Sequence, residues 1–329
     1  MIGLGIEGTA HSLGIGLADE SGKVLANAKK EYVPRRGGIH PREAAQHHGE
    51  NLPSLLSETL ERAKISFDDI GVIAFSRGPG LGPCLRTVAT AARALALCLN
   101  LPLVGVNHCI AHVEIGKVTT GCADPVTVYV SGGSTQILAF VGGRYRVFGE
   151  TQDIALGNAL DTFAREAGIQ EFPGAKRVEQ LALGGKYVPL PYTVKGTDLS
   201  FSGLVTHALD LHRSGQALED LCFSVQEVSF SMLTEVAERA LAHTAKTELL
   251  LTGGVAANKR LREMLQTMCR ERSCRFSVVP FEYAMDNGAM IAWNGIQMYR
   301  SGQTIEPAKS TVKPRWRTDQ VTARWVTAS

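Results

Sequence analysis

The stretch around which this chain is organised is Asn107-His108-Cys109-Ile110-Ala111-His112-Val113-Glu114. His108 and His112 are about one helical turn apart, so in a helix both imidazoles project from the same face. Two imidazoles on one face can hold a metal ion between them. The same spacing also occurs on solvated helix faces and in polar pockets of a core, so the spacing alone leaves both interpretations open.

The residues on either side favour the metal-binding interpretation. The apolar run Leu103–Val106 predicts a buried strand, and the histidine pair lies where this strand passes into a helix. Functional sites in α/β proteins gather at the carboxyl ends of such strands. Cys109 follows His108, whereas a metallopeptidase of the zincin type needs a glutamate there as its general base. The stretch therefore predicts a metal site without the protease motif.

Length, charge and cysteine content limit the class of protein. A chain of 329 residues with 44% hydrophobic residues can form two lobes, each with its own core. Its seven cysteines are odd in number and never spaced C-x-x-C, which argues against a disulfide framework and against a zinc ribbon. We expect a soluble, cytoplasmic protein, because the start lacks a signal peptide and the most apolar helical stretch, 88–99, is too short to span a bilayer.

The net charge of +2 does not by itself demand a nucleic-acid partner. A nucleic acid would have to bind a local basic patch, and a solvated face remains the alternative for each one. Three clusters are candidates: Lys259-Arg260-Arg262, Arg270-Arg272-Arg275 and Lys313-Arg315-Arg317.

A coarse internal repeat predicts the architecture. Residues 2–18 read as strand, small-residue turn and strand, and residues 126–140 repeat this order. Two such halves facing each other across a nucleotide are the plan of the actin-like ATPases and sugar kinases. We therefore predict an α/β fold of two lobes with a nucleotide in the cleft between them. Lobe I is 1–122, lobe II is 123–295, and a C-terminal segment, 296–329, returns to lobe I.

Two further segments, and one histidine-rich helix, carry polar residues. The predicted strand Glu248–Thr252 runs into Gly253–Asn258, where glycines can approach an adenosine and Asn258 can hydrogen-bond it, although a tight packing turn is the alternative. Asp286 opens a predicted helix, where an N-cap is its simplest role. His47 and His48 lie early on a helix predicted from Pro41, and we expect them on a solvated face.

Eight ordered segments then carry a resemblance to a known family. They are Gly5–His11, Gly37–Pro41, Gly78–Gly82, Asn107–His112, Tyr129–Gly133, Asp198–Gly203, Gly253–Asn258 and Asp286–Met290. Together they resemble the universal tRNA threonylcarbamoyladenosine synthase family, which is TsaD in bacteria and the catalytic subunit of the KEOPS complex in archaea and eukaryotes. The resemblance spans nearly the whole chain and is closer to the archaeal members.

The resemblance implies an activity and a set of site residues. The family transfers a threonylcarbamoyl group from threonylcarbamoyl-AMP to the adenosine next to the anticodon, in tRNAs that read codons starting with A. It implies one divalent metal ion, iron with zinc as the alternative, and ATP or threonylcarbamoyl-AMP as bound nucleotide. Metal ligands would be His108, His112, Tyr129 and Asp286; nucleotide-binding residues would be Tyr129, Val130, Ser131, Gly132, Gly133, Asp161, Gly174, Glu179 and Asn258.

The resemblance also implies how the lobes and partners work together. Asp286 would come from lobe II and the two histidines from lobe I, so that the metal would tie the lobes together. Glu7, at the end of the first strand, is the predicted general base. Expected partners are tRNA, a small atypical protein kinase and other KEOPS subunits, with no membrane. Two other hypotheses remain: a metallopeptidase, and a non-catalytic ATP-binding subunit that regulates a partner kinase.

Overall fold

The computed structural model describes residues 1–34, 38–171 and 173–326, so Gly37 of the second family segment lies outside the described residues. The chain divides into two compact units. Unit 1 comprises Met1–Thr119, Gly142–Tyr145 and Asp286–Ser329, and unit 2 comprises Thr120–Val141 and Arg146–Met285. No helix among the described residues is long and apolar enough to cross a membrane.

The sheet of unit 1 has the strand order β3-β2-β1-β4-β5. Strands β1 to β3 form an antiparallel meander, and β4 and β5 run parallel to β1. The elements are β1 (Ile2–Glu7), β2 (Ser12–Asp19), β3 (Val24–Glu31), α1 (Pro41–Ala63), β4 (Ile70–Gly78), α2 (Gly82–Cys98), β5 (Leu103–Asn107), α3 (His108–Thr120) and α10 (Gly288–Arg300). Short 3-10 turns occur at Phe67–Asp69, Pro307–Lys309 and Thr318–Gln320.

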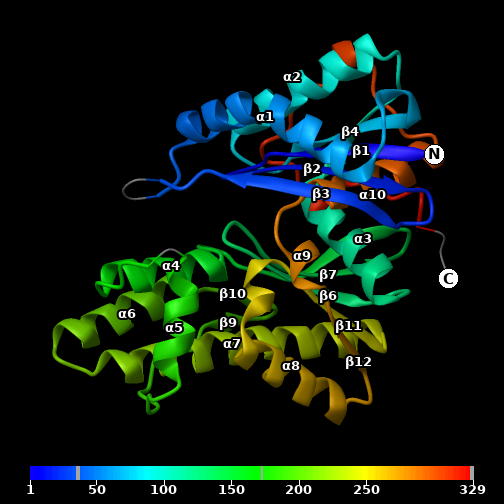
Figure 1. The fold of residues 1–329 in the computed structure, drawn as a ribbon. Helices are drawn as coiled ribbons and strands as arrows, with labels where there is room; N and C mark the ends of the chain where they lie inside the picture. Colours follow the sequence, from blue (N-terminus) through cyan, green and yellow to red (C-terminus); the bar gives the residue numbers. More distant parts are fainter. Residues whose placement is uncertain (35–37, 172, 327–329) are drawn as a thin grey trace. The chain divides into compact units, whose positions relative to one another are not determined.

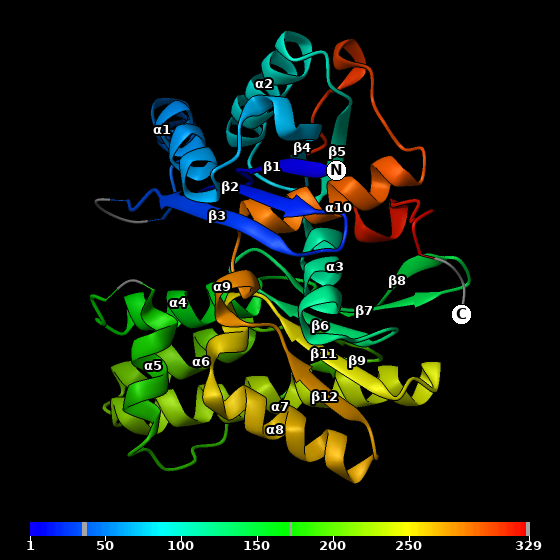
Figure 2. The same cartoon turned by 45° about the vertical axis from the view of Figure 1, so that its right-hand side comes forward.

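The two faces of this sheet are covered differently because residues alternate along each strand. Leu4 and Ile6 point into a core completed by α1 and α2. Gly3 and Gly5 point to the opposite face, where α10 packs so closely that a Cβ on Gly5 would lie 2.2 Å from the backbone nitrogen of Ala292. Figures 1 and 2 show α1 and α2 on one face of the sheet and α10 on the other. The absence of side chains at these glycines therefore allows α10 to pack directly on the sheet.

Unit 2 contains a sheet with the strand order β12-β11-β6-β7-β8 and a small two-stranded ribbon. Strand β6 is parallel to β11 and antiparallel to β7. The elements are β6 (Val126–Val130), β7 (Thr135–Val141), β8 (Arg144–Glu150), α4 (Leu156–Glu166), α5 (Gly174–Ala182), β9 (Val194–Lys195), β10 (Asp198–Leu199), α6 (Ser202–Arg213), α7 (Leu218–Thr244), β11 (Glu248–Thr252), a 3-10 turn (Gly254–Ala257), α8 (Lys259–Glu271), β12 (Arg275–Val278) and α9 (Phe281–Ala284).

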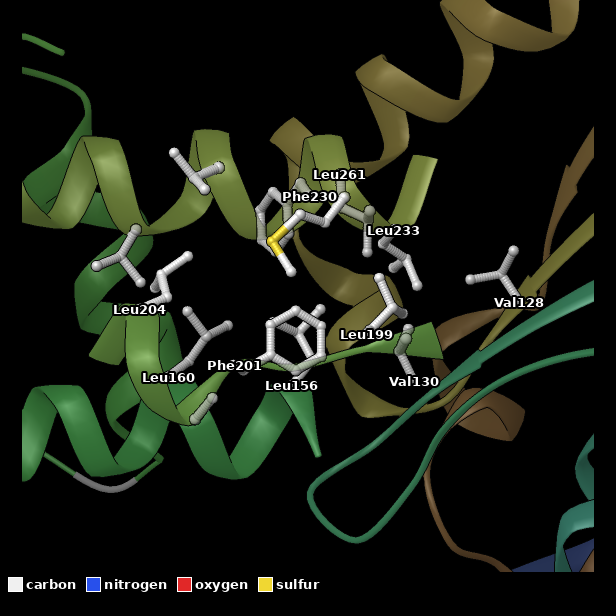
Figure 3. Packing of buried hydrophobic residues seen from close by; sticks show 14 of the residues in the cluster. Val128, Val130, Leu156, Leu160, Leu199, Phe201, Leu204, Phe230, Leu233 and Leu261 are labelled. Atoms are coloured by element: carbon white, nitrogen blue, oxygen red, sulfur yellow. The ribbon is translucent and has the colours of Figure 1, made fainter. Parts of the chain in front are cut away.

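The core of unit 2 joins its helices to the sheet. Figure 3 shows Leu156 and Leu160 of α4, Leu204 of α6 and Phe230 of α7 packed together, with Val128 and Val130 at the edge of this group. All of them are buried. This packing fixes the amino-terminal ends of α4 and α8 relative to the carboxyl ends of β6 and β11, where the predicted nucleotide residues lie.

The division of the chain differs from the prediction at its second boundary. We predicted that residues 286–295 belong to lobe II, but α10 packs on β1, β2 and β4, so Asp286 and the whole of α10 belong to unit 1. The prediction that Asp286 comes from the second lobe is therefore wrong. The sequence around Asp286 does not indicate this assignment, because the surface on which α10 packs is formed by glycines of β1 and β2, far away in the sequence.

A second difference concerns the histidines of α1. We expected His47 and His48 on a solvated helix face, but the His48 side chain is fully buried. A Cβ on Gly8 would lie 3.2 Å from its imidazole, so the absence of a side chain at Gly8 makes room for it. Burial, together with the neighbouring His47, lowers the pKa of His48 to about 4, so this imidazole is neutral at pH 7.

Candidate active site

The candidate metal centre lies in unit 1 and is built from His108, His112 and Asp286. The two histidines lie one turn apart at the start of α3, directly after the buried strand β5. Asp286 precedes α10. The Nε2 atoms of His108 and His112 lie 3.4 Å and 3.3 Å from Oδ1 of Asp286. One ligand atom from each residue lies within 4.8 Å of the other two.

These distances fit a shared metal ion. Two ligand atoms that are each roughly 2.1 Å from a tetrahedral ion lie about 3.4 Å apart. Burial lowers the pKa of His112 against the opposing effect of Asp286, which favours the neutral imidazole that binds metals. Burial alone would raise the pKa of Asp286, but the two histidines hold it well below its usual value. The donor set of two imidazoles and one carboxylate suits iron(II) and zinc.

Local structure leaves Asp286 available for this centre. The residue that caps α10 is Asn287, whose side-chain oxygen accepts a hydrogen bond of 2.9 Å from the backbone N–H of Met290. The simplest sequence-based role for Asp286, an N-cap, therefore belongs to its neighbour. Asn107 does the same for α3, because its Oδ1 accepts from the backbone N–H groups of Cys109 and Ile110. Both caps fix the backbone beside a metal ligand.

Glu7 orients the first histidine. Its Oε2 lies 3.0 Å from Nδ1 of His108, and its Oε1 accepts a hydrogen bond of 2.8 Å from the backbone N–H of Thr9. A carboxylate on Nδ1 holds the proton there and leaves the lone pair of Nε2 for a metal, as in carboxylate–histidine–metal triads. The Glu7 side chain is fully buried. The predicted general-base role of Glu7 stays a prediction, and its contacts favour the orienting role.

The predicted nucleotide residues lie in unit 2, and contacts link several of them. Ser131, Gly132 and Gly133 form the turn that follows Val130 at the end of β6. Ser131 closes the turn with a hydrogen bond of 2.8 Å from its N–H to the carbonyl of Ser134. Gly132 and Gly133 have open space where a Cβ would be. The amino-terminal end of α4 lies against this turn, because the N–H of Gly157 donates to the carbonyl of Ser131 at 3.2 Å.

A second group of these residues gathers where α4, α5 and α8 meet. Oδ1 of Asp161 accepts from the N–H of Ala175, next to Gly174 at the start of α5, at 2.9 Å. Oε1 of Glu179 accepts from the N–H of Lys259 at 2.8 Å. Each carboxylate thus binds the amino-terminal end of a neighbouring helix, which is a stabilising position for negative charge.

Asn258 completes this group. Its side chain caps α8 by accepting from the N–H of Leu261, and its amide donates to Gln226. The preceding Gly253 has φ of +95°, and a Cβ there would lie 2.2 Å from the carbonyl oxygen of Val130. This close approach aligns Gly253–Asn258 with the Ser131–Gly133 turn at the ends of two parallel strands, β6 and β11. The packing-turn role and a nucleotide role are therefore compatible for this segment.

Comparison with known proteins identifies the family. The family described as TsaD, tRNA N6-adenosine threonylcarbamoyltransferase, matches residues 23–293. The tRNA N6-adenosine threonylcarbamoyltransferase of Thermococcus sibiricus is 58% identical over 327 residues, which cover 99% of this chain and 100% of that protein. The chain belongs to the tRNA N6-adenosine threonylcarbamoyltransferase family.

Two other similarities complete the comparison. A probable bifunctional tRNA threonylcarbamoyladenosine biosynthesis protein of Methanothermobacter thermautotrophicus is 57% identical over 332 residues, and the match covers 100% of this chain but only 62% of that protein. Component A of the (R)-2-hydroxyglutaryl-CoA dehydratase of Acidaminococcus fermentans shares the fold, with a TM-score of 0.57 at 13% identity over 91% of this chain and 98% of that one.

The comparisons and the structure together confirm three predictions. The sequence resemblance is confirmed, and so is the interpretation as a transferase that acts in tRNA threonylcarbamoylation. The predicted α/β fold of the actin-like ATPase and sugar kinase type is confirmed by the two mixed sheets and the shared fold.

The structure brings His108, His112 and Asp286 together in unit 1 and gathers the predicted nucleotide residues in unit 2. Tyr129 is buried on β6 in unit 2, and its predicted part in the metal site stays a prediction. Sequence reasoning missed the orienting residues, namely Asn107, the pairing of Glu7 with His108, and Thr9, whose hydroxyl lies 3.4 Å from Nδ1 of His108. The available signal was their position directly beside predicted site residues.

Proposed function

We propose that this chain transfers the threonylcarbamoyl group of threonylcarbamoyl-AMP to the N6 amine of the adenosine next to the anticodon, in tRNAs that read codons starting with A. The observation that carries the proposal is the His108, His112 and Asp286 cluster, backed by Glu7, in a chain of this transferase family. A divalent ion held there, iron with zinc as the alternative, would act as a Lewis acid on a carbonyl or phosphate oxygen.

The protein's own residues would do the remaining work through binding and orientation. An exocyclic amine is a weak nucleophile, so most of the acceleration has to come from positioning and from stabilisation of developing charge. We propose that ATP or threonylcarbamoyl-AMP binds through the Tyr129–Gly133 turn and through Asp161, Gly174, Glu179 and Asn258. The open space beside Gly132 and Gly133 supports this placement, because no side chain on these two residues would keep a phosphate away from the backbone of the turn.

The proposed partners are tRNA, a small atypical protein kinase and other KEOPS subunits. The support for a partner with a second activity is that the Methanothermobacter relative is named bifunctional and that this chain spans only 62% of it. We further propose a cytoplasmic location, where the tRNA substrate is present.

The test is transfer of label from threonine to tRNA. The assay supplies ATP, bicarbonate, the enzyme that makes threonylcarbamoyl-AMP and the partner subunits, with Asp286→Ala as the inactive control. Label that requires this chain and disappears in the variant supports the transferase. Cleavage of protein substrates without labelled tRNA would instead support the metallopeptidase hypothesis, and nucleotide binding without either reaction would support the regulatory-subunit hypothesis.

A further inference from the structure

The three basic clusters that the sequence offers as nucleic-acid surfaces differ in how far carboxylates neutralise them. In the two clusters of unit 2, carboxylates neutralise several arginines. Nε of Arg260 lies 2.5 Å from Oε1 of Glu227, and Nε of Arg272 lies 2.9 Å from Oε1 of Glu238. Nη1 of Arg275 lies 3.3 Å from Oε1 of Glu248. The charge of these arginines is balanced within the fold, which weakens the case that they bind phosphates.

In the third cluster, near the C-terminus, Arg317 pairs with Asp319, but Lys313 and Arg315 differ from it. Within the described residues, no carboxylate oxygen lies within 4.0 Å of a side-chain nitrogen of Arg77, Lys313 or Arg315. Arg77 donates to carbonyl oxygens instead, at 2.7 Å to Thr311 and 3.4 Å to Lys309. Burial, together with the charge of Arg77, lowers the pKa of Lys313. Arg77 and Lys313 are therefore neighbouring cations, and in the described part of the chain no carboxylate pairs with either of them.

The backbone holds these cations in a fixed frame. The N–H of Lys313 donates to the carbonyl of Arg77 at 2.8 Å, and the N–H of Gly80 donates to the carbonyl of Pro314 at 3.1 Å. A Cβ on Gly78 would lie 1.9 Å from the carbonyl oxygen of Lys313, so the C-terminal segment lies directly on the end of β4. The positions of the cations are therefore set by a buried strand and not by a free tail.

An aromatic ring and a hollow complete this surface. Nζ of Lys313 lies 4.9 Å from the ring centroid of Trp316, within cation–π distance. A hollow of about 230 Å³ is lined in part by Arg77, Lys313, Trp316 and Gln320. The carbonyl of Trp316 accepts a hydrogen bond of 3.3 Å from Asn107, the residue before the ligand His108. The surface and the metal centre thus share one scaffold in unit 1.

We propose that Arg77, Lys313, Arg315 and Trp316 bind the sugar–phosphate backbone of the tRNA substrate, with Trp316 as the aromatic surface for a base. We refer to these four residues as the basic tail surface. Cations without a carboxylate partner next to an aromatic ring are the combination that holds single-stranded nucleic acid segments. The proposal rests on the proposed function, because tRNA is the substrate of that reaction.

The test measures binding of unmodified tRNA to the full chain by fluorescence anisotropy over a range of salt concentrations. The double variant Lys313→Ala/Arg315→Ala should bind at least tenfold more weakly at low salt. The slope of log Kd against log salt concentration should fall by about one for each phosphate that the variant no longer neutralises. Trp316→Ala should weaken binding, whereas Trp316→Phe should retain part of it.

The matched control is Arg317→Ala. Arg317 is in the same segment, but its guanidinium pairs with Asp319 at 3.2 Å, so its loss should change tRNA affinity by no more than about twofold. Unchanged melting temperature and metal content in each variant would show that the fold is intact. Wild-type affinity and salt slope in the double variant, or no binding by the unaltered chain at low salt, would overturn the proposal.

The outcome is separable from the proposed reaction because binding does not require transfer. If the unaltered chain labels tRNA and the double variant binds tRNA normally, the basic tail surface fails and the reaction stands. If the variant loses tRNA binding but the unaltered chain labels none, the surface stands and the reaction fails. Binding of vesicles with anionic lipids or of an acidic peptide, without tRNA binding, would overturn the assignment of the partner.

Discussion

The Nε2 atom of His112 lies 3.3 Å from Oδ1 of Asp286, although the two residues are 174 positions apart in the sequence. The contact exists because α10 packs without intervening side chains on the glycines of β1 and β2. It places a carboxylate opposite two imidazoles whose spacing was already fixed by one turn of α3. The metal centre therefore depends on helix packing at least as much as on its ligands.

His108→Ala, His112→Ala and Asp286→Ala should each strip most of the bound metal, because two remaining ligands hold a divalent ion weakly. Elemental analysis of the purified variants measures this. His207→Ala is the control, since His207 is exposed on α6 in unit 2. Full metal occupancy in all three variants would show that the ion is held elsewhere.

Glu7→Gln should lower metal affinity by about 10- to 100-fold, the usual effect of altering a carboxylate that orients a metal-binding histidine. Glutamine retains the size of the side chain, so the fold should persist. Competition with a chelator gives the affinity. If activity is lost while metal affinity is unchanged, the general-base role predicted for Glu7 is favoured over the orienting role.

Asp161→Ala and Glu179→Ala should weaken binding of ATP, since a charged hydrogen bond to a ribose hydroxyl contributes roughly 1.5 to 3 kcal/mol. Because both carboxylates also bind helix ends, each change should also cost about 0.5–2 kcal/mol of stability. Calorimetric titration and thermal unfolding separate the two effects. Unaltered affinity in both variants, with lower stability, would leave these residues with a capping role alone.

Gly16→Ala should destabilise unit 1 and reduce metal binding together. A Cβ at Gly16 would lie 2.1 Å from the backbone nitrogen of Ala289 on α10, two residues from Asn287. Overpacking of this kind costs roughly 1–3 kcal/mol or more. Gly203→Ala is the control, because a Cβ at Gly203 meets no atom within 4 Å. Thermal unfolding and metal content are the readouts, and a wild-type profile for Gly16→Ala would contradict the close packing.

Stability should fall as the pH is lowered from about 6.5 towards 4, partly because of His48. Burial, with His47 nearby, lowers the pKa of His48 from 6.5 to about 4. Between these values the unfolded chain binds a proton that the folded chain does not, so acid favours unfolding by up to about 1.4 kcal/mol per pH unit. Denaturant unfolding across this range should show a smaller pH slope for His48→Gln than for the unaltered protein. Equal slopes would mean that His48 is not buried in its neutral form.

The sequence determined the features that depend on local order along the chain. The strand Leu103–Asn107 followed by a helix with His108 and His112 on one face follows from apolar runs and helical spacing, and the structure confirms both elements. The repeated strand, turn and strand at residues 2–18 and 126–140 predicted the two-part α/β fold in the same way, because hairpins are made by neighbouring residues.

Tertiary structure alone decided the features that depend on contacts between distant segments. Nothing near Asp286 indicates that α10 packs on β1 and β2, so its place in unit 1 could not be read from the sequence. The pairing of Glu7 with His108 and the neutralisation of Arg260 by Glu227 join residues 101 and 33 positions apart. A side chain's charge and role are set by what packs against it, and chain order specifies that packing only through the complete fold.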